Sequence, residues 1–452
     1  MMKSVFIFFV LDALLFISPL EILAQTRRIT WNEQPKSFSF HEGIVCTDAT
    51  RIKYKKNGKT KAVIKLSKPI IIGMAENEEP WGYYQFPSIG KDENGVLLIG
   101  WSMIEDSHTT YGQKTKRKEP SGRVSFDGGK TWQTPVNEYN TRRRAYNAVL
   151  RNGDYITVDY PAAKDITKYN SFPKPIEKFS NYSFYKTSQL PDDLQGAYLV
   201  FLEHNTKQGK AIHAHIDDPG LVRYAIDNLM PINWWGNIKE LKDGSLMAGV
   251  YPCQYINSKE KVLPGGISFY RTTDCGENWR LQGHIPYVVN KSIGPKEEAF
   301  VLDGFTEPAF EVMPDGTFVC VMRTGGNTPM YSSLSKDQGK TWTTPQAIAP
   351  NGVFPQLMLL DNGVLVLASG RPGLQLRFCL DGTGENWTDP IDMMNFMGDN
   401  GAPDIYASCG YAALMPINRN TFFLVYSDFH TKNLQGEDRK SIKLRKITVN
   451  KR

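Results

Sequence analysis

The sequence of 452 residues has little cysteine and few long apolar runs. Only 6 cysteines are present, and no two of them have the C-x-x-C spacing of a structural zinc site. So few cysteines in so long a chain cannot form a dense disulfide scaffold, and we expect mostly free, buried thiols. After the N-terminal segment no run of about 18 apolar residues follows, which argues against a membrane-spanning helix.

The excess of positive charge is also small, with a formal net charge of +6. Part of it lies in two short runs, KTKRK at residues 114–118 and RRR at residues 142–144. No aromatic-rich nucleic-acid motif accompanies either run, so we expect no nucleic-acid partner. The runs are typical of solvated loops, and the alternative is that they attract an acidic glycan.

The first residues have the pattern of an export signal. Lys3 precedes an apolar run, and the small residue Ala24 precedes Gln25. This pattern predicts a signal peptide over residues 1–24 and an exported protein, periplasmic or extracellular. We expect a lead-in segment with a strand over residues 25–80 and one domain over residues 81–452.

Helical periodicity is scarce in that domain, but one octapeptide recurs. SFDGGKTW at residues 125–132, TTDCGENW at 272–279 and SKDQGKTW at 335–342 share a Ser or Thr, an Asp, a Gly and a Trp in register. A fourth copy, CLDGTGENW at residues 379–387, has one extra residue before its Trp. The pattern is typical of a hairpin whose Asp bonds the turn backbone and whose Trp packs on the sheet. Asp127, Asp274 and Asp337 are therefore expected to be structural and not catalytic.

A second element recurs between the octapeptides. It is a turn with Asp or Asn, usually with Gly, that leads into an apolar run of strand-forming residues. The six copies begin at residues 91, 151, 242, 313, 360 and 416. Repeats that begin tens of residues apart, each with several strands, predict an all-β fold, a β-propeller with six blades.

These repeats resemble the Asp-box of the sialidase (neuraminidase) superfamily, whose catalytic domain is a six-bladed propeller. The resemblance extends from about residue 83 to about residue 428. It implies a secreted exo-glycosidase that releases a terminal, acidic sugar from a glycan and needs no cofactor. The family uses a Tyr nucleophile activated by a Glu, an Arg cluster that holds the substrate carboxylate, and an Asp general acid.

Several of these parts have counterparts in this sequence. The segment FTEPAFEVMPDGTFVCVMR resembles the family's Glu and second Arg, which gives Glu307 and Arg323. In LVLASGRPGLQLRFCLDG, Arg371 takes the place of the third Arg, and Arg377 is a neighbour that could be confused with it. The segment CGYAALMPINRNTFFLVYS resembles the nucleophile segment and selects Tyr411. Tyr406 is the second choice for the nucleophile, and Glu307 with Arg323 could instead form a structural ion pair.

The sequence departs from the family at the first Arg. The segment YYQFPSI places Gln85 at that position, and a Gln brings no charge to a carboxylate clamp. For the general acid, the loop SMIEDSHTTYG offers Asp106 first and His108 second. His108 is also a candidate for substrate binding.

Three alternatives to a sialidase follow from these departures. One is a propeller that binds glycan without cleaving it. Another is a hydrolase retuned to a different sugar, such as a uronate-linked rhamnosidase, and the third is a polysaccharide lyase on the same scaffold. His213 and His215 have the alternating spacing of a strand, but no third ligand accompanies them, so no metal is expected.

Overall fold

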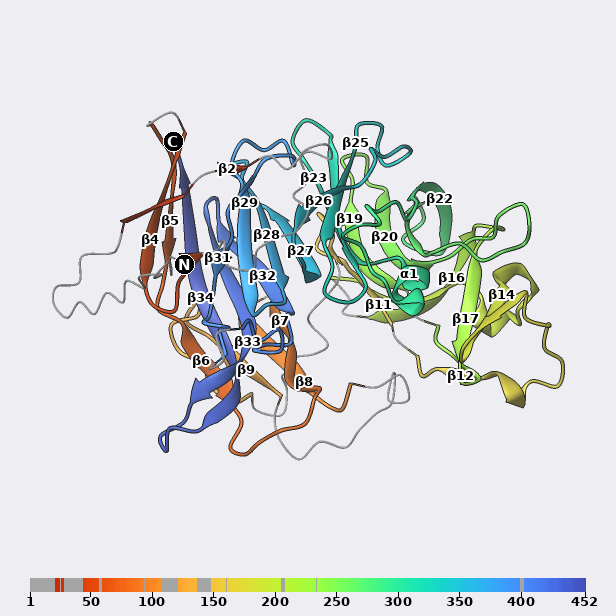
Figure 1. Ribbon diagram of the computed structural model, residues 1–452, viewed down its shortest axis with the longest axis horizontal. Helices are drawn as coiled ribbons and strands as arrows, with labels where there is room; N and C mark the ends of the chain where they lie inside the picture. The colour runs from red at the N-terminus through yellow and green to blue at the C-terminus, as the bar shows by residue number, and fades with distance from the viewer. Residues whose placement is uncertain are drawn as a thin grey trace, which may run out of the picture.

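The computed structural model describes residues 21–24, 26–27, 44–56, 59–92, 94–106, 121–135, 148–159, 161–204, 208–232, 234–398 and 402–452. This part of the chain is almost entirely β-structure, with one short α-helix, α1 (Glu298–Asp303) (Figure 1). None of its helices has the length and apolar character needed to cross a bilayer. The predicted signal peptide falls outside the described residues except for β1 (Glu21–Ala24), and residues 114–118 and 142–144 fall outside them entirely.

Four sheets carry the parts of the molecule discussed below. Each is named by the first strand of the hairpin that contains its predicted turn. The β7 sheet contains β7 (Tyr83–Lys91), β8 (Leu97–Met103) and β9 (Gly122–Ser125). The β23 sheet contains β23 (Phe305–Val312), β24 (Phe318–Thr324), β25 (Met330–Ser335) and β26 (Gln346–Ala349). The β27 sheet contains β27 (Val353–Leu359), β28 (Leu365–Gly370), β29 (Leu374–Cys379), β31 (Ile391–Asp392) and β3 (Ile44–Val45). The β32 sheet contains β32 (Ala412–Asn418), β33 (Thr421–Lys432), β34 (Asp438–Lys451), β6 (Ile70–Met74), β5 (Lys59–Leu66), β4 (Thr50–Lys56) and β1.

An eight-stranded sheet joins two antiparallel halves through one parallel pair, β16 with β22. The β10 half contains β10 (Ala148–Val149), β11 (Tyr155–Val158), β15 (Ala197–Leu202) and β16 (Gly209–Asp217). The β19 half contains β19 (Trp235–Glu240), β20 (Leu246–Cys253), β21 (Gly266–Thr272) and β22 (Asn278–Ile285).

The six turn elements of the sequence all form hairpins between the first two strands of a sheet or half-sheet. In five of them the same backbone bond closes the turn, from a Gly N–H to the carbonyl of the residue three positions earlier. The donors of these bonds are Gly95, Gly153, Gly244, Gly316 and Gly363. The turn residues and the apolar runs that follow them therefore placed these strands correctly.

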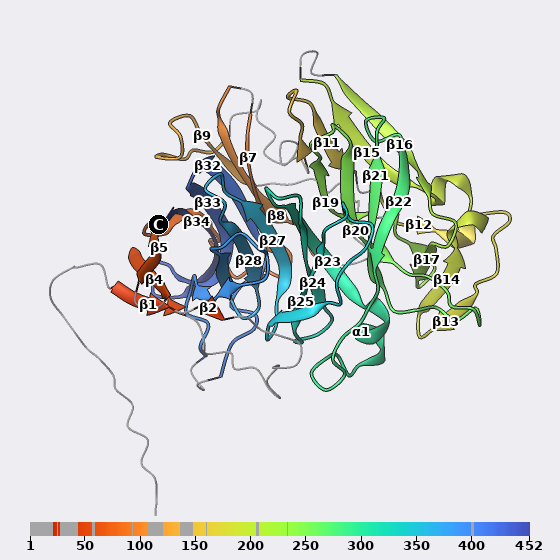
Figure 2. The same ribbon diagram turned by 90° about the horizontal axis from the view of Figure 1, so that it is seen from above.

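The first strands of these units contact one another in the order β7, β32, β27, β23, β19, β10. Apolar clusters fill the same junctions, for example Phe423 with Ile99 between the β32 and β7 sheets, and Phe310 with Phe269 between β23 and β21. Sheets stacked face to face around their first strands form a propeller-like arrangement (Figure 2). The all-β propeller prediction is confirmed in this form, and the count of six blades stays a prediction.

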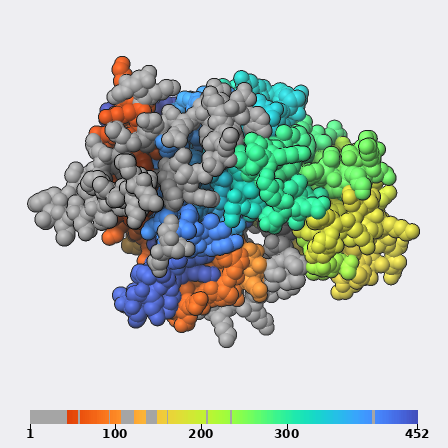
Figure 3. Space-filling model, viewed as in Figure 1, coloured from red at the N-terminus to blue at the C-terminus, as the bar shows by residue number. Residues whose placement is uncertain are grey.

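Strands from the N-terminal and C-terminal parts of the described chain lie in one sheet. β5 and β6 both pair with β34, so strands from residues 50–74 extend the sheet of the C-terminal strands. Figure 3 shows the orange and blue segments side by side. The division of the chain at residue 80 stays a prediction.

Part of the extra segment at residues 161–227, together with residues 229–230, forms a separate five-stranded sheet at one end of the molecule (Figure 1), whereas β15 and β16 of this segment belong to the β10 half. Its strands are β12 (Lys164–Asp165), β18 (Leu229–Met230), β17 (Val222–Ile226), β14 (Tyr182–Lys186) and β13 (Glu177–Phe179).

The octapeptides occupy the turns that follow the third strands. In the three matched copies, Asp127, Asp274 and Asp337 each accept bonds from a Ser or Thr hydroxyl two residues earlier and from the backbone N–H four residues later, at 2.6–3.0 Å. The Trp of each copy donates its indole N–H to the Gly carbonyl three residues earlier, at 3.0–3.3 Å. These aspartates therefore use their hydrogen-bonding capacity within the turn.

All six cysteines lack a disulfide partner, and Cys275 alone among them is exposed. The expectation of mostly free, buried thiols is confirmed.

Candidate active site

Glu307, in the β23 sheet, and Tyr411, beside the β32 sheet, meet next to the β27 sheet, which lies between those two sheets. The Tyr411 hydroxyl donates a hydrogen bond of 2.5 Å to Glu307 Oε1, although 104 residues separate them in the sequence. Glu307 lies in β23, and Tyr411 directly precedes β32. The pairing predicted from the sequence is thus present as a direct contact.

Two further donors hold the Glu307 carboxyl group. Arg323 Nη1, from β24, donates to Oε1 at 3.1 Å, and the backbone N–H of Phe354, in β27, donates to Oε2 at 2.7 Å. The Glu307 side chain is only 5% exposed, whereas that of Arg323 is 18% exposed. Three donors on two oxygens fix the orientation of the carboxylate and leave Arg323 in partial contact with solvent.

Three strands around the site share the same backbone irregularity, a residue with positive φ at a shift of strand register. Phe86, Glu307 and Phe354 all have positive φ, at 51°, 49° and 44°, and each precedes a proline in the first strand of its sheet. The strand register shifts at each of these positions. A bulge re-aims a side chain relative to regular pairing, and a non-glycine residue with positive φ costs about 1–3 kcal/mol. Three sheets therefore carry the same strained bulge at the ends that face the site.

Arg371 reaches the site from the end of β28. Its neighbour Gly370 lies so close to Gly410 that a Cβ at Gly370 would stand 2.0 Å from the Gly410 Cα. Gly410 also has a positive φ of 81°, and a Cβ there would meet Val353 at 2.4 Å. Glycine at both positions lets the two backbones approach, which brings Arg371 next to Tyr411.

Two guanidinium groups, those of Arg323 and Arg371, lie beside Glu307. Burial, and then the charge of Arg323, lower the pKa of Arg371. Burial opposes the charge of Arg323 as well, but Glu307 and Tyr411 outweigh it and raise the pKa of Arg323. The Nε atoms of both arginines are buried and have no hydrogen-bond partner among the described residues. Two neighbouring guanidinium groups that are only partly buried can bind an anionic group.

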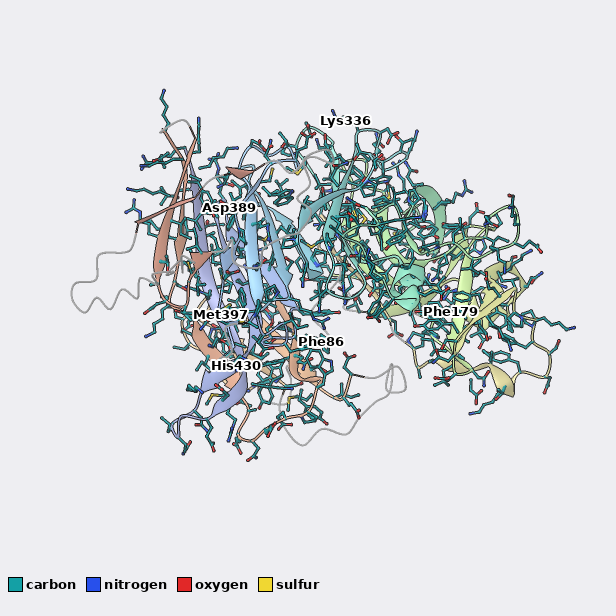
Figure 4. The ribbon with its side chains drawn as sticks, in the orientation of Figure 1. Phe86, Phe179, Lys336, Asp389, Met397 and His430 are labelled. Carbon is teal, nitrogen blue, oxygen red and sulfur yellow. The ribbon has the colours of Figure 1, made fainter. Side chains whose placement is uncertain are left out.

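Two phenylalanines enclose the ring of Tyr411. Phe354 stacks on it with 4.0 Å between ring centroids, and Phe86, labelled in Figure 4, meets it edge-on at 4.8 Å. Burial, and then the charge of Glu307, raise the pKa of Tyr411 well above its usual value near 10. The resting Tyr411 is therefore a neutral phenol bonded to a carboxylate. Sequence reasoning missed both phenylalanines, although the shared Phe-Pro dipeptide of two first strands was a visible signal.

Gln85 is fully buried, and neither its amide oxygen nor its amide nitrogen has a hydrogen-bond partner among the described residues. It pairs with Ser102 across β7 and β8, and the next residue, Phe86, contacts Tyr411. Gln85 therefore lies beside the site as a neutral, unsatisfied group. Contact of its amide with a substrate stays a prediction.

Of the two residues considered as the general acid, Asp106 is exposed, and its Oδ2 accepts a 3.0 Å bond from Trp81 Nε1. His108 lies outside the described residues. The structure adds a carboxyl group that the sequence did not suggest, because Asp303 at the end of α1 is near Arg323. Burial raises the pKa of Asp303 to about 6, and Arg323 opposes the rise.

Arg377, the alternative to Arg371, and Tyr406, the alternative nucleophile, have different surroundings. Arg377 is 4% exposed and donates to Gln375 Oε1 at 3.1 Å on the same strand, β29. Tyr406 is 53% exposed, and Arg371 Cζ lies 5.4 Å from its ring centroid. The residue in contact with Glu307 is Tyr411, and not Tyr406.

Comparison with known proteins yields no matching protein family and no matching curated protein. Among solved structures, a protein of unknown function from Dyadobacter fermentans is similar, with 16% identity and a TM-score of 0.53 over 86% of this chain and 99% of that one. A Hadza microbial sialidase has 16% identity and a TM-score of 0.43, over 81% of this chain and 65% of its own. A GH93 α-L-arabinofuranosidase of Fusarium graminearum has 12% identity and a TM-score of 0.45, over 84% and 97%. The first likeness supports a shared fold, and the other two are too distant to bear on function.

Proposed function

We propose that this protein is an exported, retaining exo-glycosidase that releases a terminal acidic sugar from a glycan. The observation that carries the proposal is the 2.5 Å bond from the Tyr411 hydroxyl to Glu307 in a site that also holds Arg323. A phenol bonded to a carboxylate is a nucleophile with its general base in place. Most retaining glycosidases use a carboxylate nucleophile, and sialidases with their Tyr nucleophile are an exception.

In the first step the Tyr411 oxygen attacks the anomeric carbon and its proton passes to Glu307. Burial, and then the charge of Glu307, raise the pKa of Tyr411, so the phenol is neutral at rest and Glu307 accepts its proton as the bond to the anomeric carbon forms. The bond to the leaving oxygen breaks, and Asp106 protonates that oxygen. Water then attacks the glycosyl-tyrosine intermediate, gives a proton to the acid group, and Tyr411 recovers its proton from Glu307.

The acidic group of the sugar would lie against Arg323 and Arg371. Both arginine side chains are only partly buried, so their guanidinium groups have donors for a bound carboxylate. A neutral nucleophile suits such a substrate because a carboxylate nucleophile would approach a like charge. The neutral Gln85 leaves two guanidinium groups to hold the anion, which favours a sugar other than an ordinary sialoside.

A panel of glycans ending in sialic acid, uronic acid or rhamnose, with detection of the released sugar, tests the proposal. We expect release of one terminal sugar with retained configuration by the wild type and none by Tyr411→Phe. An unsaturated product that absorbs in the ultraviolet would instead establish a lyase. Binding to the panel with no released sugar would establish a glycan-binding propeller.

The identity of the acid can be tested separately with Asp106→Asn and Asp303→Asn. Loss of a general acid slows substrates with a poor leaving group far more than aryl glycosides, whose leaving oxygen needs little protonation. We expect that selective loss for Asp106→Asn. The same selectivity in Asp303→Asn alone would transfer the role to Asp303.

A further inference from the structure

Three aromatic residues form an open cluster beside the site, which we call the aromatic platform: Trp81, Tyr406 and Phe429. The ring of Trp81 meets Tyr406 edge-on at 5.9 Å between centroids and Phe429 edge-on at 6.1 Å. Tyr406 is 53% exposed, so much of a large ring faces solvent. An isolated exposed ring needs no explanation, but a fixed cluster that adjoins a polar site does.

Several contacts hold the platform in place. The backbone N–H of Tyr406 donates to Asp404 Oδ1 at 2.8 Å, and the ring of His430 bonds Asp404 Oδ2 at 2.9 Å. His430 is labelled in Figure 4, on β33. On the other side, Lys440 Nζ bonds the Pro80 carbonyl at 2.8 Å and lies 6.0 Å from the Trp81 ring. The exposed ring of Tyr406 and the half-buried rings of Trp81 and Phe429 are thus held in place by their neighbours, which reduces the entropy lost when a ligand binds.

The platform is also linked to the groups that act on substrate. Arg371 Cζ lies 5.4 Å from the centroid of Tyr406, and Trp81 Nε1 donates to Asp106 Oδ2 at 3.0 Å. Gly82 brings the Asp106 backbone close, because a Cβ there would stand 2.6 Å from the Asp106 N. One unbroken series of contacts therefore runs from Asp106 through Trp81 and Tyr406 to Arg371.

We propose that the aromatic platform is a second sugar subsite, which binds the pyranose ring next to the one that is released. This inference rests on the proposed function, in which Asp106 protonates the oxygen that joins the two sugars. The sugar on the leaving side must then lie beside Asp106, where the platform is. The C–H face of a pyranose packs on an exposed aromatic ring, and Arg371 and Asp106 offer polar partners for the hydroxyl groups at its edge.

The test measures binding without turnover, in a Tyr411→Phe background. The probes are reducing-end-labelled trisaccharides that end in sialic acid, glucuronic acid or rhamnose, each beside the methyl glycoside of the same terminal sugar. For the trisaccharide that binds, Tyr406→Ala should weaken the affinity about tenfold, which equals about 1.4 kcal/mol, because the ring that contacts the second sugar is removed. The affinity for its methyl glycoside should change far less, because that probe lacks the second sugar.

Two controls separate ring contact from other effects. Tyr406→Phe keeps the ring and should keep the affinity, whereas Phe126→Ala removes an equally exposed ring, at 55%, from an octapeptide turn and should change nothing. An equal loss for trisaccharide and methyl glycoside, no loss for the trisaccharide, or no binding of any probe would overturn the subsite. Hydrolysis by the wild type tests the proposed function independently, since a trisaccharide can bind the platform whether or not it is cleaved.

Discussion

The octapeptide turns and the candidate active site use polar residues in opposite ways. In the turns, Asp127, Asp274 and Asp337 accept several hydrogen bonds from their own hairpin. In the site, Arg323 and Arg371 keep buried Nε donors that no described residue satisfies. A polar motif that satisfies itself stabilises a fold, whereas one that leaves donors open has capacity for a ligand. Residues that recur most clearly in the sequence are therefore not the ones expected to carry the chemistry.

The largest effect is expected from removal of the Tyr411 hydroxyl, which tests its role as the nucleophile. Tyr411→Phe should lower kcat by at least about 10⁴-fold, because a nucleophile is lost while the fold is kept. Released-sugar kinetics on the best substrate of the panel give the value. An unchanged melting temperature would show that the loss is chemical, and residual activity above one part in about a hundred would contradict the mechanism.

The matching change in a turn is Trp279→Ala. Trp279 is fully buried, packs 5.0 Å from Trp234 and donates to Gly276 at 3.0 Å. Its removal should cost about 3–5 kcal/mol of unfolding free energy, measured by chemical denaturation. Activity per folded molecule should stay the same, and a large fall in that activity with little loss of stability would reverse the assignment of roles.

Substitution of Arg371 tests whether the arginines of the site bind an acidic substrate. Arg371→Ala should raise KM for an acidic sugar by roughly ten- to a hundredfold, since hydrogen bonds to charged groups contribute about 1.5–3 kcal/mol. Arg371→Lys should recover part of the loss, because it keeps the charge without the planar fork. KM values for acidic and neutral aryl glycosides decide the matter, and an equal effect on both would argue against an acidic substrate.

Gln85 is the residue for which stability and function should conflict. Gln85→Met removes a buried amide without partners among the described residues, so it should raise the unfolding free energy by about 1 kcal/mol. If the amide contacts substrate, KM should rise in the same variant. Calorimetry and kinetics on one preparation separate the two effects, and a less stable variant would indicate that the amide is bonded in the folded protein.

The smallest expected effect is on the melting temperature at low pH, through Asp337. A side-chain bond from Thr341, followed by its backbone N–H, lowers the pKa of Asp337 to about 2. The folded pKa is depressed, so the turn's contribution is complete above the unfolded value near 3.8 and is lost as pH falls toward 2. Asp337→Asn should therefore flatten the fall of the melting temperature between pH 4 and pH 2, and an unchanged slope would show that the Asp337 bonds contribute little.

The repeats made the architecture predictable. The turn glycines and the apolar runs that follow them are local signals, and all six predicted turns join the first two strands of a sheet or half-sheet. The resemblance to sialidases selected Glu307, Arg323 and Tyr411, which the structure brings into contact. It gave no indication of Phe354, whose N–H and ring both contact that pair. Neither did it suggest Asp303 or the aromatic platform, because no local pattern marks residues that meet only after folding.

Local sequence is enough to predict where strands and hairpins form, because turn residues and apolar runs act over a few neighbouring positions. It also determined that the octapeptide aspartates bond within their own turns. Tertiary structure alone decided that Tyr411 lies 2.5 Å from a carboxylate 104 residues away, and that Arg371 lies beside a second guanidinium group. Such contacts depend on how whole sheets pack and on the close approach of Gly370 and Gly410, which the order of residues along one strand does not specify.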